Sequence, residues 1–404
     1  MTPESLREQL QGFQRSHARE ERSAWGQARL APLPAVDDEF SDLFRGETLA
    51  DVREVFRGTQ GRHRRWDRFI VAGRQRRECR DERRALAASL QQVRLGDGIG
   101  EDETAMEQAL ALAAAGEHRE EEDGPCGHDA VPRHLLAQRA RLEDRRRRSE
   151  EEGSEEIRQA LPAGRADDIW QSLIGPAGFL RRGDGEIRRG DGLESGCLPE
   201  AIPQLIHLVI QSGAGLEAWD AQLRAAGSAL ALAHMPPDLA AEDRWLPGEE
   251  GAGVYGRLWA RRLLDPSWLE SVGVIGLRQE VAAGQARERL AARLLALADA
   301  VMEGRPGPLP PGWRWLASWP ADSAAAMAQL CGLPTARAVL HDEHLAALLD
   351  HVLLRRWGHR WESSRQGADL LRQLWSEGWA RPLTELLSLL GESDPHGDVL
   401  MEKF

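Results

Sequence analysis

The residues best suited to metal chemistry are the histidines of HDEHLAALLDH, residues 341–351. On a helix that turns 100° per residue, His341, His344 and His351 project within about 80° of one another. At 1.5 Å per residue, however, His344 and His351 lie about 10.5 Å apart along the axis, so all three cannot share one ion. Only His341 and His344 could pair on a metal, with carboxylates from elsewhere. The alternative is that these histidines border the apolar face of the helix.

Several enzyme classes are excluded by residues that the chain lacks. Its one lysine, Lys403, lies in the terminal MEKF, away from any glycine-rich loop. A P-loop and a protein kinase each need a lysine on the nucleotide phosphates, and both are therefore excluded. The sequence has no G-x-S-x-G elbow, no G-x-G-x-x-G after a strand and no H-E-x-x-H. We therefore expect no cofactor.

A second kind of chemistry, the binding of an anion, is suggested by GRHRRWDRFIVAGRQRRECRDERR, residues 61–84. Read as a helix, this stretch has one stripe at spacings of four and three residues. The stripe contains Trp66, Ile70, Gly73, Arg77, Arg80 and Arg84, and it is widened by Arg76 and Arg83. Because the stripe starts apolar and turns cationic, either the chain breaks at Gly73 or the helix leaves the core there.

Three partners can face this arginine stripe: water, an acidic run of the same chain, or an external polyanion. The acidic runs considered are Glu120–Asp123 and Glu150–Glu156. A second basic and aromatic cluster, LRRWGHRWESSR at 354–365, favours the polyanion, since arginine and tryptophan together hold single-stranded nucleic acids. Its candidate binding residues are Arg355, Arg356, Arg360, Trp357 and Trp361. Phosphates would be bound by arginine forks, with salt-sensitive affinity.

The elements that must position these residues are predicted to be helices, and the fold class to be all-α. Residues 1–160 are expected to form a multi-helix region with a long basic helix at 63–93 and acidic loops. Residues 161–404 are expected to form a Trp-rich helical domain with a Gly-rich loop at 176–198 and a Pro-rich connection at 305–312. Strand signals are scarce, and the best of them, residues 202–210, also fits a helix.

Composition indicates a bacterial, cytoplasmic protein. The 404 residues include no Asn, one Lys and one Tyr, as in a very GC-rich gene, so arginine must fill every cationic role. This weakens the argument from arginine count alone. The four cysteines form no C-x-x-C pair, the first residues lack the apolar region of a signal peptide, and no apolar run is long enough to span a membrane.

These observations together predict a non-catalytic subunit or adaptor of a larger bacterial assembly. Its partners would be other protein subunits and, through the arginine and tryptophan clusters, DNA or RNA, but not a membrane. One alternative is a metal-dependent enzyme that uses His341 and His344 of the C-terminal helical domain. The other is a scaffold that binds proteins only.

Overall fold

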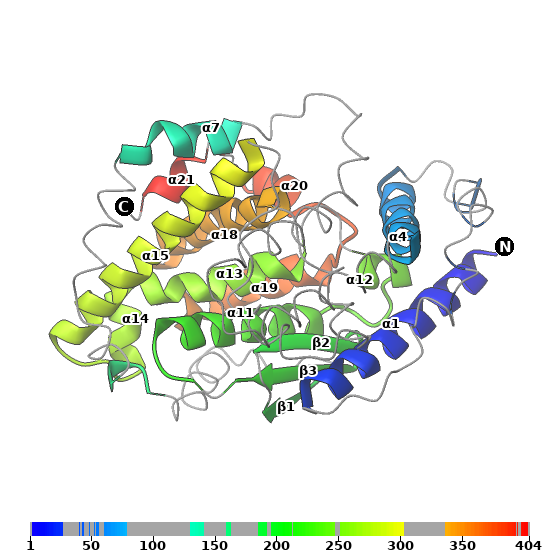
Figure 1. Cartoon of the computed structure of the whole chain (residues 1–404), viewed down its shortest axis with the longest axis horizontal. Helices are drawn as coiled ribbons and strands as arrows, with labels where there is room; N and C mark the ends of the chain where they lie inside the picture. The colour runs from blue at the N-terminus through cyan, green and yellow to red at the C-terminus, as the bar shows by residue number, and fades with distance from the viewer. Residues whose placement is uncertain are drawn as a thin grey trace, which may run out of the picture.

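The computed structural model of the chain is mostly helical, with one small sheet (Figure 1). It describes residues 2–26, 40, 43, 48, 52, 54–55, 60–78, 130–140, 159–162, 185–191, 195–211, 213–246, 251–302, 336–392, 394 and 397–402. The predicted Pro-rich connection at 305–312 and the acidic runs at 120–123 and 150–156 lie outside these residues. None of the described helices is both long and apolar enough to cross a bilayer.

The helices before the sheet are α1 (Pro3–Gly26), α4 (Gln60–Glu78) and α7 (Ala130–Ala137). Leu6, Leu10 and Phe13 recur at helical spacing, and they are buried on one face of α1. The predicted basic helix at 63–93 is observed as α4, and its residues after Glu78 lie outside the described part of the chain. Since α4 continues through Gly73, the helix does not break there.

The sheet corrects the all-α prediction. It contains β1 (Glu186–Asp191), β2 (Gly196–Ala201) and β3 (Leu205–Ile210) in the order β1-β3-β2. β3 is parallel to β1 and antiparallel to β2, with a register irregularity between Pro199 and Ala201. Two of these strands fall wholly or partly in the predicted Gly-rich loop at 176–198.

The physical reason for this error differs between the strands. LIHLVI in β3 is a short apolar run, which periodicity alone cannot assign to a strand or a buried helix. The sequence EIRRGD of β1 is mostly exposed and has little intrinsic strand signal. It is a strand because the backbone of β3 supplies its hydrogen-bond partners, so that tertiary context overrides local preference.

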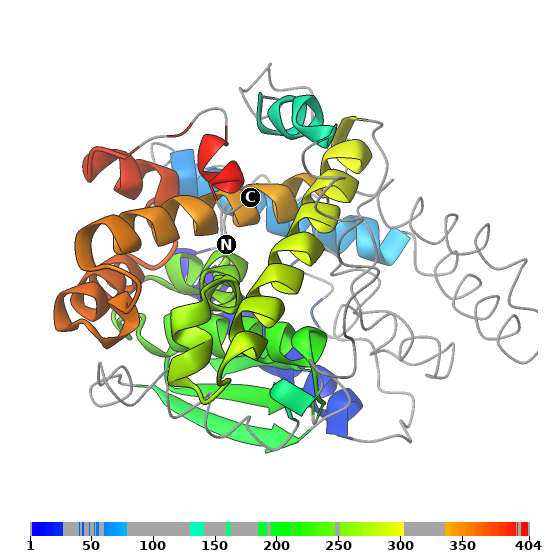
Figure 2. The same ribbon diagram turned by 90° about the vertical axis from the view of Figure 1, so that its left-hand side faces the viewer.

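After the sheet, helices again account for nearly all of the described chain. They are α11 (Leu216–Ala233), α12 (Ala241–Trp245), α13 (Ala252–Ala260), η5 (Arg261–Leu264), α14 (Pro266–Ser271), α15 (Leu277–Met302), α18 (Ala336–Trp357), η6 (Trp361–Ser363), α19 (Arg365–Ser376), α20 (Leu383–Leu389) and α21 (Asp398–Met401). α11 lies against the sheet, and α15 crosses the other helices on the side away from it (Figures 1 and 2). α14 begins with Asp265-Pro266, where the side chain of Asp265 caps the helix by accepting from the Ser267 amide at 3.0 Å.

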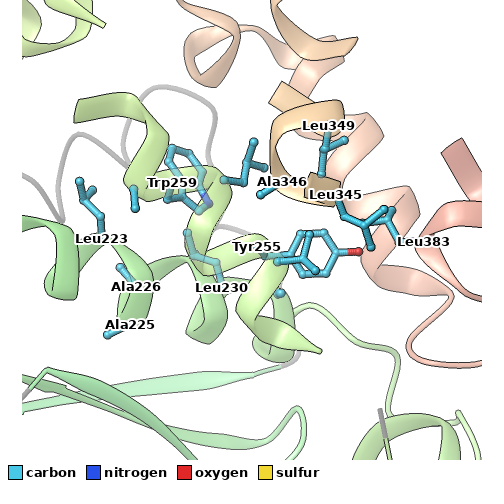
Figure 3. Close-up of a cluster of buried hydrophobic side chains, with 14 of the residues drawn as sticks. Leu223, Ala225, Ala226, Leu230, Tyr255, Trp259, Leu345, Ala346, Leu349 and Leu383 are labelled. Carbon is cyan, nitrogen blue, oxygen red and sulfur yellow. The ribbon is translucent and has the colours of Figure 1, made fainter. Parts of the chain in front are cut away.

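The centre of the core is α13, which lies between α11 and α18 (Figure 3). Tyr255 and Trp259 of α13 fill this layer and are buried. α11 and α13 approach closely because two glycines lie between them. A Cβ added at Gly227 would lie 2.6 Å from the Tyr255 carbonyl oxygen, and one at Gly256 would lie 2.6 Å from the Arg224 carbonyl oxygen. This contact fixes the spacing of the helices that carry the buried charges described below.

Candidate functional site

The first arginines of the stretch form ion pairs with α12. We call the pairs of Arg7, Arg62 and Arg65 with Glu242 and Asp243 the clamp. Arg62 and Arg65 of α4 both pair with Asp243, the Arg62 Nη2 atom at 2.6 Å, and Arg65 also donates to the Trp379 carbonyl. From α1, Arg7 donates to both oxygens of Glu242, at 2.8 and 2.9 Å. Both carboxylates are almost fully buried. An acidic segment of the same chain, α12, therefore faces Arg62 and Arg65, while the two acidic runs predicted to face the stripe lie outside the described residues.

Burial and pairing act on the pKa values of this clamp in opposite directions. Burial lowers the pKa of Arg65, and it outweighs the attraction of Asp243. For Glu242 burial favours the protonated form, yet the bond from Arg7 keeps the pKa below its usual value. The clamp thus depends on complete pairing, because a buried charge left alone is strongly destabilising.

The apolar half of the predicted stripe is confirmed, because Trp66 and Ile70 are fully buried. The side chains of its cationic half, Arg76, Arg77, Arg80, Arg83 and Arg84, lie outside the described residues. The polyanion contact proposed for them stays a prediction from the sequence.

The second cluster, at 354–365, is divided between the core and the C-terminal segment. Trp361 is fully buried, and its Nε1 atom donates to Asp350 Oδ1 at 3.2 Å. Arg355 pairs with Glu392, and Arg356 Nη2 donates to the Leu390 carbonyl at 3.2 Å. The remaining candidates, Trp357 and Arg360, are partly buried and exposed, respectively. Because Trp361 is in the core, it offers no face on which a base could stack.

Two histidines of α18, His344 and His351, contact the C-terminal segment. His344 Nε2 lies 3.3 Å from Asp394 Oδ2, and His351 Nδ1 lies 2.8 Å from Glu402 Oε2. Asp394 in turn accepts the amides of Gly397, Asp398 and Val399 at the start of α21. Burial lowers the pKa of His344, despite the nearby Asp394 carboxylate. Within the described chain, these contacts dock α21 onto α18 rather than bring His341 and His344 together with two carboxylates.

A group of charged side chains from four helices surrounds Glu343, which precedes His344 in the segment predicted to hold metal ligands. We call it the Glu343 cluster, and it contains Asp220 and Arg224 of α11, Arg257 of α13, Arg293 of α15, and Asp342 and Glu343 of α18. Arg257 Nη1 lies 2.8 Å and Arg293 Nη2 lies 3.4 Å from the same oxygen, Glu343 Oε1. Four helices therefore each contribute charge to one point in the core.

The electrostatics of the Glu343 cluster separate its two adjacent carboxylates. Burial favours protonated Glu343, but the guanidinium groups of Arg293 and Arg257 outweigh burial and lower its pKa to about 2. Burial raises the pKa of Asp342 to about 6, although Arg257 lies 3.6 Å from it. Burial also lowers the pKa of Arg293 to about 10. Such opposed shifts in neighbouring groups are found at functional sites more often than elsewhere.

Sequence reasoning missed this cluster because its members are far apart in the chain. Arg224 and Arg257 stand inside apolar stretches, LRAAG and YGRLWA, where a charge breaks the pattern of a core helix. This charge within an apolar pattern is the sequence signal that could have identified Arg224 and Arg257 as candidate site residues. A second buried pair, Arg262 with Asp350, is joined by the Asp265 carboxylate and the His359 carbonyl, and it ties η5 to α18 and to the turn before η6.

No protein-family model and no curated protein matches the chain. Solved structures do match it. A carboxypeptidase from Pyrococcus furiosus has a TM-score of 0.61 and 11% identity, with 100% of this chain and 99% of that chain covered. An M32 carboxypeptidase from Deinococcus radiodurans R1 has a TM-score of 0.63 and 13% identity, with 98% and 97% covered. Metallocarboxypeptidase 1 of Trypanosoma cruzi has a TM-score of 0.62 and 12% identity, with 99% and 98% covered.

The chain shares the fold of these carboxypeptidases. This likeness contradicts the main functional prediction from the sequence, because the matching structures are carboxypeptidases and not non-catalytic adaptors, scaffolds or complex subunits that contact nucleic acid. The alternative prediction of a metal-dependent enzyme agrees better with it. The nucleic-acid part of that prediction rested mainly on Arg77, Arg80 and Arg84, whose side chains lie outside the described residues; nearer the start of the stretch, Arg62 and Arg65 pair with Asp243.

The described residues do not fit the metal that a metallocarboxypeptidase implies. Among them no three histidine, cysteine or carboxylate side chains are grouped as a metal site would need. His344 and His351 lie against separate carboxylates, and the whole sequence lacks the H-E-x-x-H pattern that places two zinc ligands on one helix. We therefore derive no catalytic step through a metal ion.

Proposed function

We propose that this chain acts on peptides as a peptidase of the carboxypeptidase fold. The proposal rests on one observation: the structural likeness covers nearly the whole length of this chain and of each carboxypeptidase compared with it. For the three carboxypeptidases compared, at least 97% of each chain is covered. A fold alone does not determine function. Shared architecture over the complete length nevertheless supports a shared class of ligand better than a match to one motif would.

The Glu343 cluster supports the location of the site. It lies at the meeting point of α11, α13, α15 and α18, it combines buried and partly exposed charges, and it contains Asp342, whose pKa burial raises to about 6. Convergent polar groups with shifted pKa values at a junction of helices are typical of a binding site. We therefore place peptide binding at this cluster.

The experiment is to incubate the purified chain with a mixture of peptides and follow their masses with time. We expect residues to be lost one at a time from the carboxyl end, and we expect peptides with an amidated carboxyl end to remain intact. Parallel reactions contain a chelator, or added zinc, cobalt or manganese, so that a metal requirement is measured directly. Peptides that stay intact under all of these conditions, and that do not bind the chain either, would contradict the proposal.

Protein subunits as partners, a cytoplasmic location and a boundary near residue 160 remain predictions from the sequence. The contacts of α1 with β2 and of α7 with α15 join the two expected regions extensively. Co-purification from the native host would test the partners.

A further inference from the structure

The charges of the Glu343 cluster balance within the cluster itself. Its carboxylates are those of Asp220, Asp342 and Glu343, and its guanidinium groups are those of Arg224, Arg257 and Arg293. The ion pairs that join them are between 2.5 and 3.6 Å long. A site for a hard divalent cation is built from carboxylates and other oxygen ligands. Because three guanidinium groups already face the three carboxylates, this cluster offers such a cation no net negative charge.

The central carboxylate, Glu343, already has its counter-charges. Its Oε1 atom is held by Arg257 Nη1 at 2.8 Å and lies 3.4 Å from Arg293 Nη2. Arg224 and Arg261 also act on Glu343 electrostatically, and the four arginines together keep its pKa low against the effect of burial. A buried charge in a protein is either paired or coordinates a metal ion. For Glu343, side chains of the same chain supply the pairing.

The neighbouring carboxylate, Asp342, is no better placed to accept a cation. Arg257 lies 3.6 Å from its Oδ2 atom. A Cβ at Gly253 would lie 2.5 Å from the same atom, so α13 packs directly on it. Burial raises the pKa of Asp342 in spite of Arg257 and His341, which act in the opposite direction. Asp342 is therefore confined between Arg257 and α13, which leaves no room for an ion on that side.

The side of the cluster that solvent reaches carries a net positive charge. The side chains of Asp220, Arg224 and Arg293 are 31%, 27% and 26% exposed, whereas that of Glu343 is 3% exposed. Because Asp220 is paired with Arg224, the three exposed groups together carry one positive charge. A divalent cation that entered from solvent would meet this charge first and the buried Arg257 next. Repulsion between like charges is strong where little water is present to screen it.

We propose that the arginines of the Glu343 cluster supply its positive charge in place of a divalent cation, so that this site binds no metal ion. The cluster thereby differs from what the fold suggests, since one of the matching structures is a metallocarboxypeptidase. The charge balance involves no ligand. The proposal therefore goes beyond the proposed function, and metal ions without any peptide can test it.

The test titrates the purified full chain with Mn²⁺ after dialysis against a chelator. Manganese is the probe because carboxylates suit it and because its electron paramagnetic resonance signal measures the free ion. We expect the wild type and Glu343→Gln to bind Mn²⁺ equally, since Glu343 takes no ion. Arg293→Gln leaves one carboxylate in excess, and we expect it to bind Mn²⁺ at least about tenfold more tightly than the wild type. Adding Glu343→Gln to this variant removes the excess and should abolish the gain.

Arg372→Gln is the matched control, because Arg372 of α19 is 29% exposed and pairs with Asp369 at 2.6 Å, away from the Glu343 cluster. It should bind Mn²⁺ as the wild type does. Near-UV circular dichroism checks that each variant is folded. If Arg293→Gln does not fold, Arg224→Gln replaces it, since Arg224 is similarly exposed and its loss removes the partner of Asp220.

Two results overturn the proposal. One is a wild-type chain that binds Mn²⁺ or Zn²⁺ at a site that Glu343→Gln weakens. The other is equal affinity for Mn²⁺ in the wild type and in Arg293→Gln. Failure of the proposed function looks different, because a chain that neither binds nor shortens peptides can still gain Mn²⁺ binding in Arg293→Gln. That combination supports the replacement of a cation by arginine while the proposed function fails.

Discussion

Replacing Glu343 with glutamine should destabilise the protein by about 3 kcal/mol at neutral pH. The pKa of Glu343 is lowered from 4.5 to about 2, and its side chain is 3% exposed, so solvent screens the shift little. A difference of about 2.5 pKa units, at about 1.36 kcal/mol for each unit, gives about 3 kcal/mol. The same order follows from removing one partner of a buried ion pair, which costs about 3–5 kcal/mol.

The lowered pKa of Glu343 also predicts how its contribution to stability changes with pH. Because the pKa of Glu343 is lower in the folded than in the unfolded protein, its stabilising effect is fully present above about pH 4.5. The effect is lost as the pH falls towards the folded value of about 2. The difference between the wild type and Glu343→Gln should therefore be constant from pH 5 to pH 7 and shrink below that range.

The assay is urea unfolding followed by tryptophan fluorescence, at neutral pH and at a series of acidic pH values. Glu377→Gln is the control, because Glu377 is 38% exposed and lies 3.9 Å from Arg381 in a surface pair. It should change stability by less than about 0.5 kcal/mol. If Glu343→Gln is as stable as this control, or if its deficit does not shrink in acid, the reasoning about the Glu343 cluster is wrong. Combining Glu343→Gln with Arg293→Gln should restore part of the loss, since the two residues share one interaction.

Three further changes test the clamp, the C-terminal contact and the central helix pair. Asp243→Asn should leave Arg65 buried without its counter-charge and should destabilise the protein by about 3 kcal/mol. The rate of amide hydrogen exchange in residues 60–78 should therefore rise. The surface variant Asp369→Asn is the control, and in it this rate should not change. The pKa of His344 is lower in the folded protein than the unfolded value of 6.5, so the folded state binds its proton less readily. The free energy of unfolding should therefore fall as the pH drops below about 6.5. In His344→Gln, unfolding midpoints measured between pH 5 and pH 7.5 should fall less. Gly227→Ala should cost about 1–3 kcal/mol because its Cβ would press on α13, whereas Gly284→Ala in α15, which has nothing within 4 Å, should be neutral or stabilising; equal thermal midpoints for the two variants would argue against the close contact of α11 with α13.

Features that depend on residues close together in the sequence, such as helix faces and helix starts, could be predicted from the sequence. The apolar face of α1 with Leu6 and Leu10, the Asp265-Pro266 start of α14 and the burial of Trp66 on the basic helix all follow from helical spacing and capping. The sheet could not be predicted with the same security, because β1 depends on β3 for its hydrogen bonds and carries no strand pattern of its own. The segment that contains His341 and His344 suggests metal ligands. The structure shows instead that Glu343, between these histidines, pairs with arginines of α13 and α15.

The sequence alone was sufficient to exclude nucleotide-binding enzymes that need a lysine, and to predict a mostly helical chain. It could also identify Arg65 and Glu343 as charged residues, but not as buried ones, because burial depends on which helices meet. Only the tertiary structure brings α4 against α12, and α11, α13, α15 and α18 against one another. Charges separated by more than a hundred residues, such as Arg224 and Glu343, act on each other because helix packing excludes the water that would otherwise screen them.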